Sequence, residues 1–208
     1  MTRLILARHG NTFGPGDTPV WVGARSDLPL VEKGVAQARA LGEALKQAHI
    51  VPDFIWAGPL QRTREAARIA AEIAGFDPTR INIETRLAEI DYGAWEGKTN
   101  AGIEAAGGGA ELAAWDEQSI YPATPGWQPA EAQIIADVVS LLDEARGKAG
   151  LVVTSNGILR FFARAAHNAG NFPGHKVATG HVCIMDYVNG KWCILSWNAA
   201  PEIAFSVA

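Results

Sequence analysis

The sequence predicts an α/β fold with a mostly parallel sheet that closes in an antiparallel edge hairpin. Short apolar runs of strand character alternate with longer stretches of helical periodicity, which is typical of parallel βαβ units. Near the end of the chain, Asn189-Gly190 separates two further apolar runs, and this dipeptide is a strong signal for a two-residue hairpin turn. The 208 residues, 48% of them hydrophobic, suffice for one domain with a substantial core.

Each predicted strand is a short apolar run, and each predicted helix has the spacing of a helix with one buried face. The expected strands are 3–7, 53–57, 151–155, 182–187 and 191–197, with a short additional strand at 82–84. The expected helices are 32–48, 60–74, 131–146 and 157–168. In the helix 60–74, a stripe of small side chains suits close packing against the sheet.

Residues 97–130 differ in composition from the rest of the chain. They contain three consecutive glycines, three prolines and two tryptophans, and they predict a long, irregular, lid-like insertion within a single domain that spans 1–208. Such a stretch is either an active-site lid or a surface excursion anchored by its own apolar cluster.

The net charge and the short apolar stretch at the N-terminus argue against several classes of protein. The formal net charge of −4 gives no reason to expect nucleic-acid binding. The apolar stretch at 1–7 is too short for a signal peptide or a membrane span, so a cytoplasmic protein without membrane association is expected.

The cysteines and histidines predict no cross-link and no metal site. In the predicted hairpin Cys183 faces Ser196 and Cys193 faces Asp186, which puts the two thiols on opposite faces, and no disulfide is expected. The five histidines lack the spacing of metal ligands, and neither a metal nor another cofactor is expected.

The first predicted strand runs directly into Arg8-His9-Gly10. In an open α/β sheet, ligands bind in the crevice outside the carboxyl ends of the strands. The neighbouring cation disfavours the imidazolium form, which leaves His9 the lone pair of a nucleophile and suits the pair to a phosphoryl group. A strand-end histidine packed against a loop is the alternative. The loop 13–23 follows directly and is expected to contact the substrate.

Arg62 is a second candidate for anion binding. It follows a predicted strand and the turn Gly58-Pro59, so it is expected in the first turn of a helix. There the five-donor guanidinium and the helix dipole both favour an anion. An exposed arginine paired with an acidic neighbour is the alternative, which fits Arg64 and Arg68 better.

Four further segments follow Arg8-His9-Gly10 in a fixed order, at residues 25–30, 57–67, 87–97 and 152–157. In kind and order they resemble the histidine phosphatase superfamily, also called the phosphoglycerate-mutase-like family, over nearly the whole chain. The resemblance implies a three-layer α/β/α sandwich and phosphoryl transfer through a phosphohistidine at His9.

The resemblance also implies roles for individual residues. Arg8 and Arg62 would clamp the phosphate, and Glu89 would be the acid/base residue, with Asp91 and Glu96 as competitors. A carboxyl group in a shielded site can protonate a leaving alkoxide and then deprotonate water. The segment around Glu89 is similar to that of small-phosphomonoester phosphatases such as those acting on α-ribazole phosphate.

Three more residues are candidates for substrate binding. Arg25 stands where relatives carry an arginine that reaches the substrate, although a salt bridge to Asp27 or Glu32 is equally compatible with the sequence. Asn11 and Thr12 offer polar groups directly after His9, and capping of the following turn is their alternative role.

Asn156 departs from the family pattern, which has a histidine at this position that donates to the phosphoryl oxygens and adds positive charge. Asparagine keeps a donor but is never cationic. The loss of charge assistance from one hydrogen bond costs ~1–2 kcal/mol, or about tenfold in rate. His181, at the start of the hairpin, could restore a cation, and a solvent-facing histidine at a strand end is the alternative.

These observations favour a phosphatase that hydrolyses a small phosphorylated substrate through His9, with activity reduced by Asn156. The alternative is a phospho-ligand-binding member with weak or no catalysis. A phosphoglycerate-mutase-type transferase is less favoured, because mutases of the family carry longer insertions with basic residues in the 97–130 region. In this chain Lys98 is the one basic residue there.

Overall fold

The chain folds around a mixed sheet in the computed structural model, which describes residues 2–172 and 174–206. Within these residues the sheet has six strands in the order β3-β2-β4-β1-β5-β6. The strands are β1 (Arg3–Arg8), β2 (Phe54–Ala57), β3 (Ile81–Ile83), β4 (Ala149–Thr154), β5 (Val182–Val188) and β6 (Lys191–Ala199). The first four are parallel to one another, and β5 pairs antiparallel with both β1 and β6, which confirms the predicted edge hairpin.

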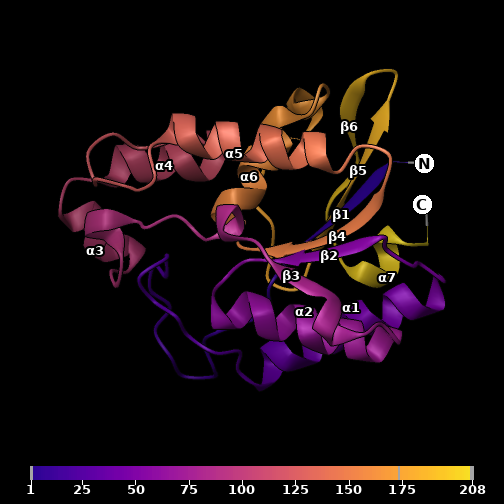
Figure 1. Ribbon diagram of the computed structural model, residues 1–208. Coiled ribbons are helices and arrows are strands. Elements are labelled where there is room, and N and C mark those ends of the chain that lie inside the picture. The colour runs from indigo at the N-terminus through magenta and orange to yellow at the C-terminus, as the bar shows by residue number, and fades with distance from the viewer. Residues whose placement is uncertain (1, 173, 207–208) are drawn as a thin grey trace.

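Helices cover both faces of the sheet (Figure 1). One face carries α1 (Glu32–Gln47), α2 (Gln61–Ala74) and the short α7 (Pro201–Ala204), and the other carries α4 (Gly109–Gln118), α5 (Glu131–Glu144) and α6 (Asn156–Ala165). α3 (Asn100–Ala105) projects beyond the sheet. Short 3-10 turns occupy Pro78–Arg80, Thr85–Leu87, Gly93–Trp95 and Ala169–Asn171. The three-layer sandwich is confirmed.

Alternation along the strands builds two cores. Leu4 and Leu6 of β1 pack with α5 and α6 on one face, while Ile5 and Ala7 pack with α1 and α2 on the other. The small-residue stripe of α2 is buried against the sheet, as its spacing predicts. None of the helices in the described ranges is both long and apolar enough to cross a membrane.

The hairpin register agrees with the prediction near the turn and departs from it farther out. Cys193 lies opposite Asp186 as expected, but the predicted pairing of Cys183 with Ser196 is wrong. Ser196 lies opposite Ile184 because the pairing shifts by one residue there, as a β-bulge does. Both thiols are free, with Cys183 buried and Cys193 half-buried.

The stretch 97–130 is partly helical, in contrast to the predicted irregular loop. It contains α3 and α4, which are too short and too weakly amphipathic to stand out in the sequence. Trp115 and Trp127 are buried at 1% and 3% exposure. The Trp127 ring packs with those of Trp21, Tyr92 and Trp115. These tryptophans are therefore continuous with the core on the α5–α6 face.

The helices that follow the adjacent strands β1 and β4 lie on opposite faces of the sheet, since β1 leads to α1 and β4 leads to α6. A crevice forms at such a switch point outside the carboxyl ends of the strands. Gly10 lets the chain leave β1 along this crevice, because a Cβ at this position would lie 2.3 Å from the carbonyl oxygen of Gly34.

Candidate active site

A cavity of about 370 Å³ lies at the carboxyl ends of β1 and β4. Seven of the nine predicted site residues line it, and the two that do not are Arg25 and His181. The seven are Arg8, His9, Asn11, Thr12, Arg62, Glu89 and Asn156. Segments far apart in the sequence therefore meet at one site.

His9 is held in one position and one tautomer. Its backbone N–H donates to Thr154 O at 3.1 Å, and its carbonyl accepts from Gly180 N at 3.1 Å. The ring Nδ1 lies 2.7 Å from Gly10 O. Because a carbonyl oxygen can only accept, Nδ1 carries the proton and donates it, which leaves the lone pair on Nε2.

Burial and positive charge keep this ring neutral. His9 is 6% exposed. Burial first, and then the charges of Arg8 and Arg62, hold the pKa of His9 well below its usual value of 6.5. The sequence identified the effect of Arg8, whereas the larger effect of burial follows from the fold.

We expect the His9 ring to remain neutral at pH ~6.5, where a free imidazole is about half protonated. Since the pKa of His9 is lower in the folded protein, the unfolded chain takes up its proton first as the pH falls. The stability contributed by neutral His9 is therefore complete above the pKa of the unfolded chain and declines as the pH drops below it. A ¹⁵N NMR titration measures the protonation state of the His9 ring, and the His9→Gln variant assigns its signals. An imidazolium spectrum at pH ~6.5 would contradict the expected neutral ring.

The two arginines bring fixed positive charge to the ring. Arg62, in the first turn of α2 as predicted, is 1% exposed. It donates from Nη1 to Ser26 O at 2.6 Å and from Nη2 to Gly23 O at 3.1 Å. Arg8 donates from Nη1 to Val177 O at 2.6 Å, and its buried Nε has no partner among the described residues. Burial lowers the pKa of both side chains, but a guanidinium stays charged in proteins.

Glu89 is the acid of its motif that reaches the cavity. It is 5% exposed and accepts from Ile90 N at 3.0 Å and from Gly157 N at 3.2 Å. Gly157 is needed for this approach, because a Cβ there would lie 2.4 Å from Glu89 Oε1. Tyr92 is also buried, and burial first, then the nearby Glu89 charge, raises the pKa of its hydroxyl.

The competing acids point elsewhere, toward Arg25. The Arg25 Nε lies 2.9 Å from Asp91 Oδ1 and 3.4 Å from Glu96 Oε2, and neither acid lines the cavity. The salt bridges of Arg25 thus involve partners other than the expected Asp27 or Glu32. Its side chain is 58% exposed, and the structure does not bring it to the cavity wall.

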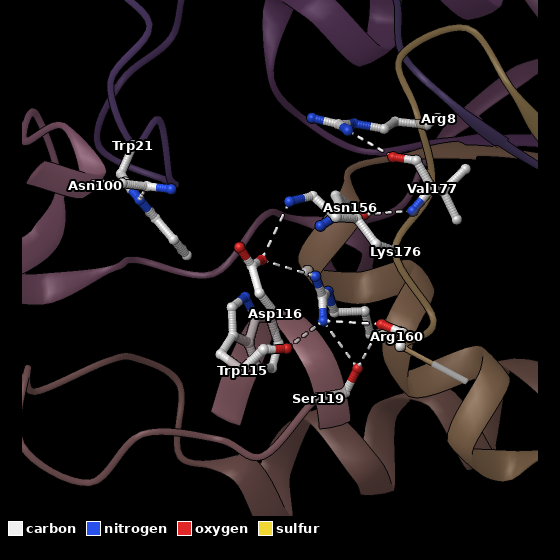
Figure 2. Close-up of polar contacts among 12 residues, drawn as sticks. Arg8, Trp21, Asn100, Trp115, Asp116, Ser119, Asn156, Arg160, Lys176 and Val177 are labelled. Carbon is white, nitrogen blue, oxygen red and sulfur yellow. Dashed lines mark hydrogen bonds and ion pairs between the residues drawn. The ribbon is translucent and has the colours of Figure 1, made fainter. Parts of the chain in front are cut away.

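Asn156 begins α6, and a hydrogen bond from the Val177 backbone orients its amide (Figure 2). Its Oδ1 accepts from Val177 N at 2.8 Å. Because the oxygen is engaged, Nδ2 is the part of the amide that remains to donate to a ligand. The same Val177 accepts from Arg8, so one backbone unit orders two of the cavity's donors.

His181 and Asn11 have structural partners. His181 Nδ1 lies 3.0 Å from Asn198 O, and its ring is not on the cavity wall. The structure therefore does not bring His181 to the phosphate site, where the sequence suggested a substitute cation. Asn11 lines the cavity, but its Oδ1 accepts from the Thr179 hydroxyl and its N–H donates to Gln37 Oε1 at 2.9 Å.

Sequence reasoning missed several residues of the cavity wall and a buried arginine that pairs with one of them. Lys176 and Asp116 line it, but neither lies in a recognised motif. Arg160 of α6 is fully buried and donates to Trp115 O, Ser119 Oγ and Gly174 O. A charged residue inside the apolar run of α6 was the available signal for Arg160. Across the ranges that the structure describes, no group of three or more His, Cys, Asp and Glu side chains is placed to hold a metal ion.

Comparison with known proteins places the chain in a family. Residues 4–200 match the model of the histidine phosphatase superfamily (branch 1). The 2,3-bisphosphoglycerate-dependent phosphoglycerate mutase of Thermobifida fusca (strain YX) is 34% identical over 127 residues, which cover 60% of this chain and 50% of that protein. The mutase of the same name from Bifidobacterium longum (strain DJO10A) is 32% identical over 122 residues, covering 58% and 48%. The match spans about half the length of these curated relatives.

Solved structures cover nearly the whole chain. A mycobacterial glucosyl-3-phosphoglycerate phosphatase has 25% sequence identity and a TM-score of 0.78, with 96% of this chain and 100% of that chain covered. The α-ribazole phosphatase from Shigella flexneri has 23% identity and a TM-score of 0.70, with 95% and 98% covered, and shares the fold. The chain belongs to branch 1 of the histidine phosphatase superfamily.

Proposed function

We propose that this protein is a phosphatase that hydrolyses a small phosphomonoester through a phosphohistidine at His9. The observation that carries the proposal is the neutral, buried imidazole, whose Nε2 has no hydrogen-bond partner among the described residues while Nδ1 donates to Gly10 O. This nucleophile shares one cavity with buried Arg62, half-buried Arg8 and the Glu89 carboxyl group. The arrangement supplies a nucleophile, anion-binding donors and a proton carrier.

In the first step, the Nε2 lone pair of His9 attacks phosphorus and the bond from phosphorus to the ester oxygen breaks. The departing oxygen takes the proton of the Glu89 carboxylic acid. Arg8 and Arg62 donate to the phosphoryl oxygens, together with Asn156 Nδ2. Because backbone contacts already fix these donors, little reorganisation is needed when negative charge develops.

In the second step, water replaces the departed alcohol. The Glu89 carboxylate takes a proton from the water, whose oxygen attacks phosphorus, and the N–P bond breaks. Inorganic phosphate leaves, His9 is neutral again, and Glu89 has regained its proton. Two backbone N–H donors hold the carboxyl group in place for both proton transfers.

Phosphoryl transfer of the mutase type is the second candidate, because curated relatives are named phosphoglycerate mutases. Two observations favour hydrolysis. The structural neighbours named as phosphatases cover 95% or more of this chain, and Lys98 is the one basic residue between 97 and 130. Phe13, Trp21 and Trp115 on the cavity wall suit a leaving group with an apolar or ring-shaped part.

A panel of phosphomonoesters tests the proposal, with release of inorganic phosphate as the readout and acid quenching to trap phosphohistidine. We expect turnover of p-nitrophenyl phosphate and of at least one sugar or alcohol phosphate, with an acid-labile phosphoenzyme. Interconversion of phosphoglycerates faster than phosphate release would identify a mutase. Binding of phosphate without turnover of any ester would identify a phospho-ligand-binding protein.

A further inference from the structure

We propose that Lys176 supplies the transferring phosphoryl group with the positive charge that Asn156, in place of a histidine, cannot provide. The inference rests on the proposed phosphoryl chemistry at His9. It extends that chemistry to a residue outside the segments that carry the family resemblance.

The backbone beside Lys176 is tied to the phosphate-binding side of the cavity. Lys176 lines this cavity together with His9. The next residue, Val177, donates its N–H to Asn156 Oδ1 at 2.8 Å and accepts from Arg8 Nη1 at 2.6 Å (Figure 2). The lysine side chain therefore starts next to the residue whose missing charge it would replace.

The following residues keep this starting point fixed. Ala178 N donates to Asn198 Oδ1 at 2.7 Å, and Gln37 Nε2 donates to Thr179 O at 2.8 Å. Gly180 N donates to His9 O at 3.1 Å. Against this anchored backbone, the four-carbon stem of a lysine can move its ammonium group, which is a compact point charge with three donors.

The present partner of the ammonium group holds it weakly. Lys176 Nζ lies 3.3 Å from Asp116 Oδ1, and the lysine side chain is 59% exposed. Charged hydrogen bonds of full strength are about 2.8 Å long, and ion pairs between exposed groups contribute little free energy. A phosphoryl dianion within reach would therefore compete well for this ammonium group.

Asp116 does not lose all its positive partners when Lys176 moves. Its Oδ1 also lies 3.4 Å from Arg160 Nη2 (Figure 2). The Arg160 side chain is fully buried and fixed by hydrogen bonds to Trp115 O, Ser119 Oγ and Gly174 O. The carboxylate keeps this permanent cation, so transfer of Lys176 leaves no unpaired charge behind.

A double-mutant cycle between Lys176 and Asn156 tests the proposal. The two measurements are the affinity for inorganic phosphate, which has no leaving group, and kcat/KM for p-nitrophenyl phosphate. We expect Lys176→Ala to lower both by about tenfold, the factor given by loss of charge assistance from one hydrogen bond. Lys46→Ala, at an exposed lysine of α1 that does not line the cavity, is the matched control and should change neither.

The Asn156→His substitution should behave differently in the two backgrounds. With Lys176 present, the site already has its cation, and we expect a gain below about threefold. In the Lys176→Ala background, Asn156→His should restore most of the tenfold loss below pH ~6.5, where an unperturbed histidine is protonated. Such non-additivity is the signature of two groups that serve the same interaction.

Three results would overturn the proposal. The first is a phosphate affinity that falls neither in Lys176→Ala nor in its combination with Asn156→His. The second is an equal gain from Asn156→His in both backgrounds. The third is a loss restricted to esters with a carboxylate, which would assign Lys176 to the leaving group instead. If the wild type binds phosphate but turns over no ester, the proposed function fails while the four phosphate affinities still decide the role of Lys176.

Discussion

His9→Ala is expected to abolish the phosphoenzyme and to lower hydrolysis by about four to six orders of magnitude. The methyl group of alanine has no lone pair to attack phosphorus. The anion-binding donors remain, because Arg8 and Arg62 are held by backbone carbonyls rather than by the imidazole. The variant should therefore still bind inorganic phosphate, and the loss should appear in kcat.

His181→Ala is the matched control, because it removes a histidine whose ring contacts Asn198 and not the cavity. We expect it to retain the wild-type rate and phosphoenzyme level. Rates are measured with p-nitrophenyl phosphate, and the phosphoenzyme is trapped from a ³²P-labelled ester. A wild-type rate of hydrolysis by His9→Ala would show that His9 is not the nucleophile. Loss of activity in His181→Ala would show that His181 contributes to the active site.

Local signals explain why much of the fold and site was predictable from the sequence. The β1 strand is a continuous apolar run, so its end and the position of His9 could be located directly. Arg62 follows a strand and a Gly-Pro turn, which fixed its place in the first turn of α2. Glu89 and Asn156 follow from motifs whose order matches a known family, and the cavity collects all four.

Contacts between distant segments explain what was not predictable. The β-bulge in the hairpin depends on packing, which a count outward from the turn ignores. Arg25 pairs with acids more than 60 residues away, Asp91 and Glu96, whereas sequence reasoning considered its neighbours. Lys176 gains its significance from Val177 and the contacts of that residue with Arg8 and Asn156.

Two loops that the sequence presents as separate form one wall of the cavity. Trp21 donates its backbone N–H to Lys98 O at 2.9 Å and accepts from Gly97 N at 2.8 Å. Its indole Nε1 donates to Asn100 Oδ1 at 2.8 Å (Figure 2). The loop 13–23 is thereby joined to the stretch 97–130, so the two together shape the space for a leaving group.

Glu89→Gln is expected to lower kcat/KM for alkyl and sugar phosphates by about 10²–10⁴-fold, the usual contribution of a positioned acid or base. An alkoxide leaving group needs the proton that the amide cannot give. p-Nitrophenolate is stable without a proton, so the first step with p-nitrophenyl phosphate should be far less affected. The second step still needs a base for the attacking water, which the amide also cannot supply.

With p-nitrophenyl phosphate, Glu89→Gln should therefore release a rapid burst of p-nitrophenolate and accumulate phosphohistidine. Rapid mixing measures the burst, and acid-quenched samples of the same reaction measure the phosphoenzyme. Glu96→Gln is the matched control, because Glu96 accepts from Ser26 Oγ at 2.7 Å and does not line the cavity. An equal loss with both classes of ester and no burst would mean that Glu89 positions Gly157 and Tyr92 without transferring protons. A burst with a stable phosphoenzyme, together with the larger loss for alkyl and sugar phosphates, would assign both proton transfers to one carboxyl group.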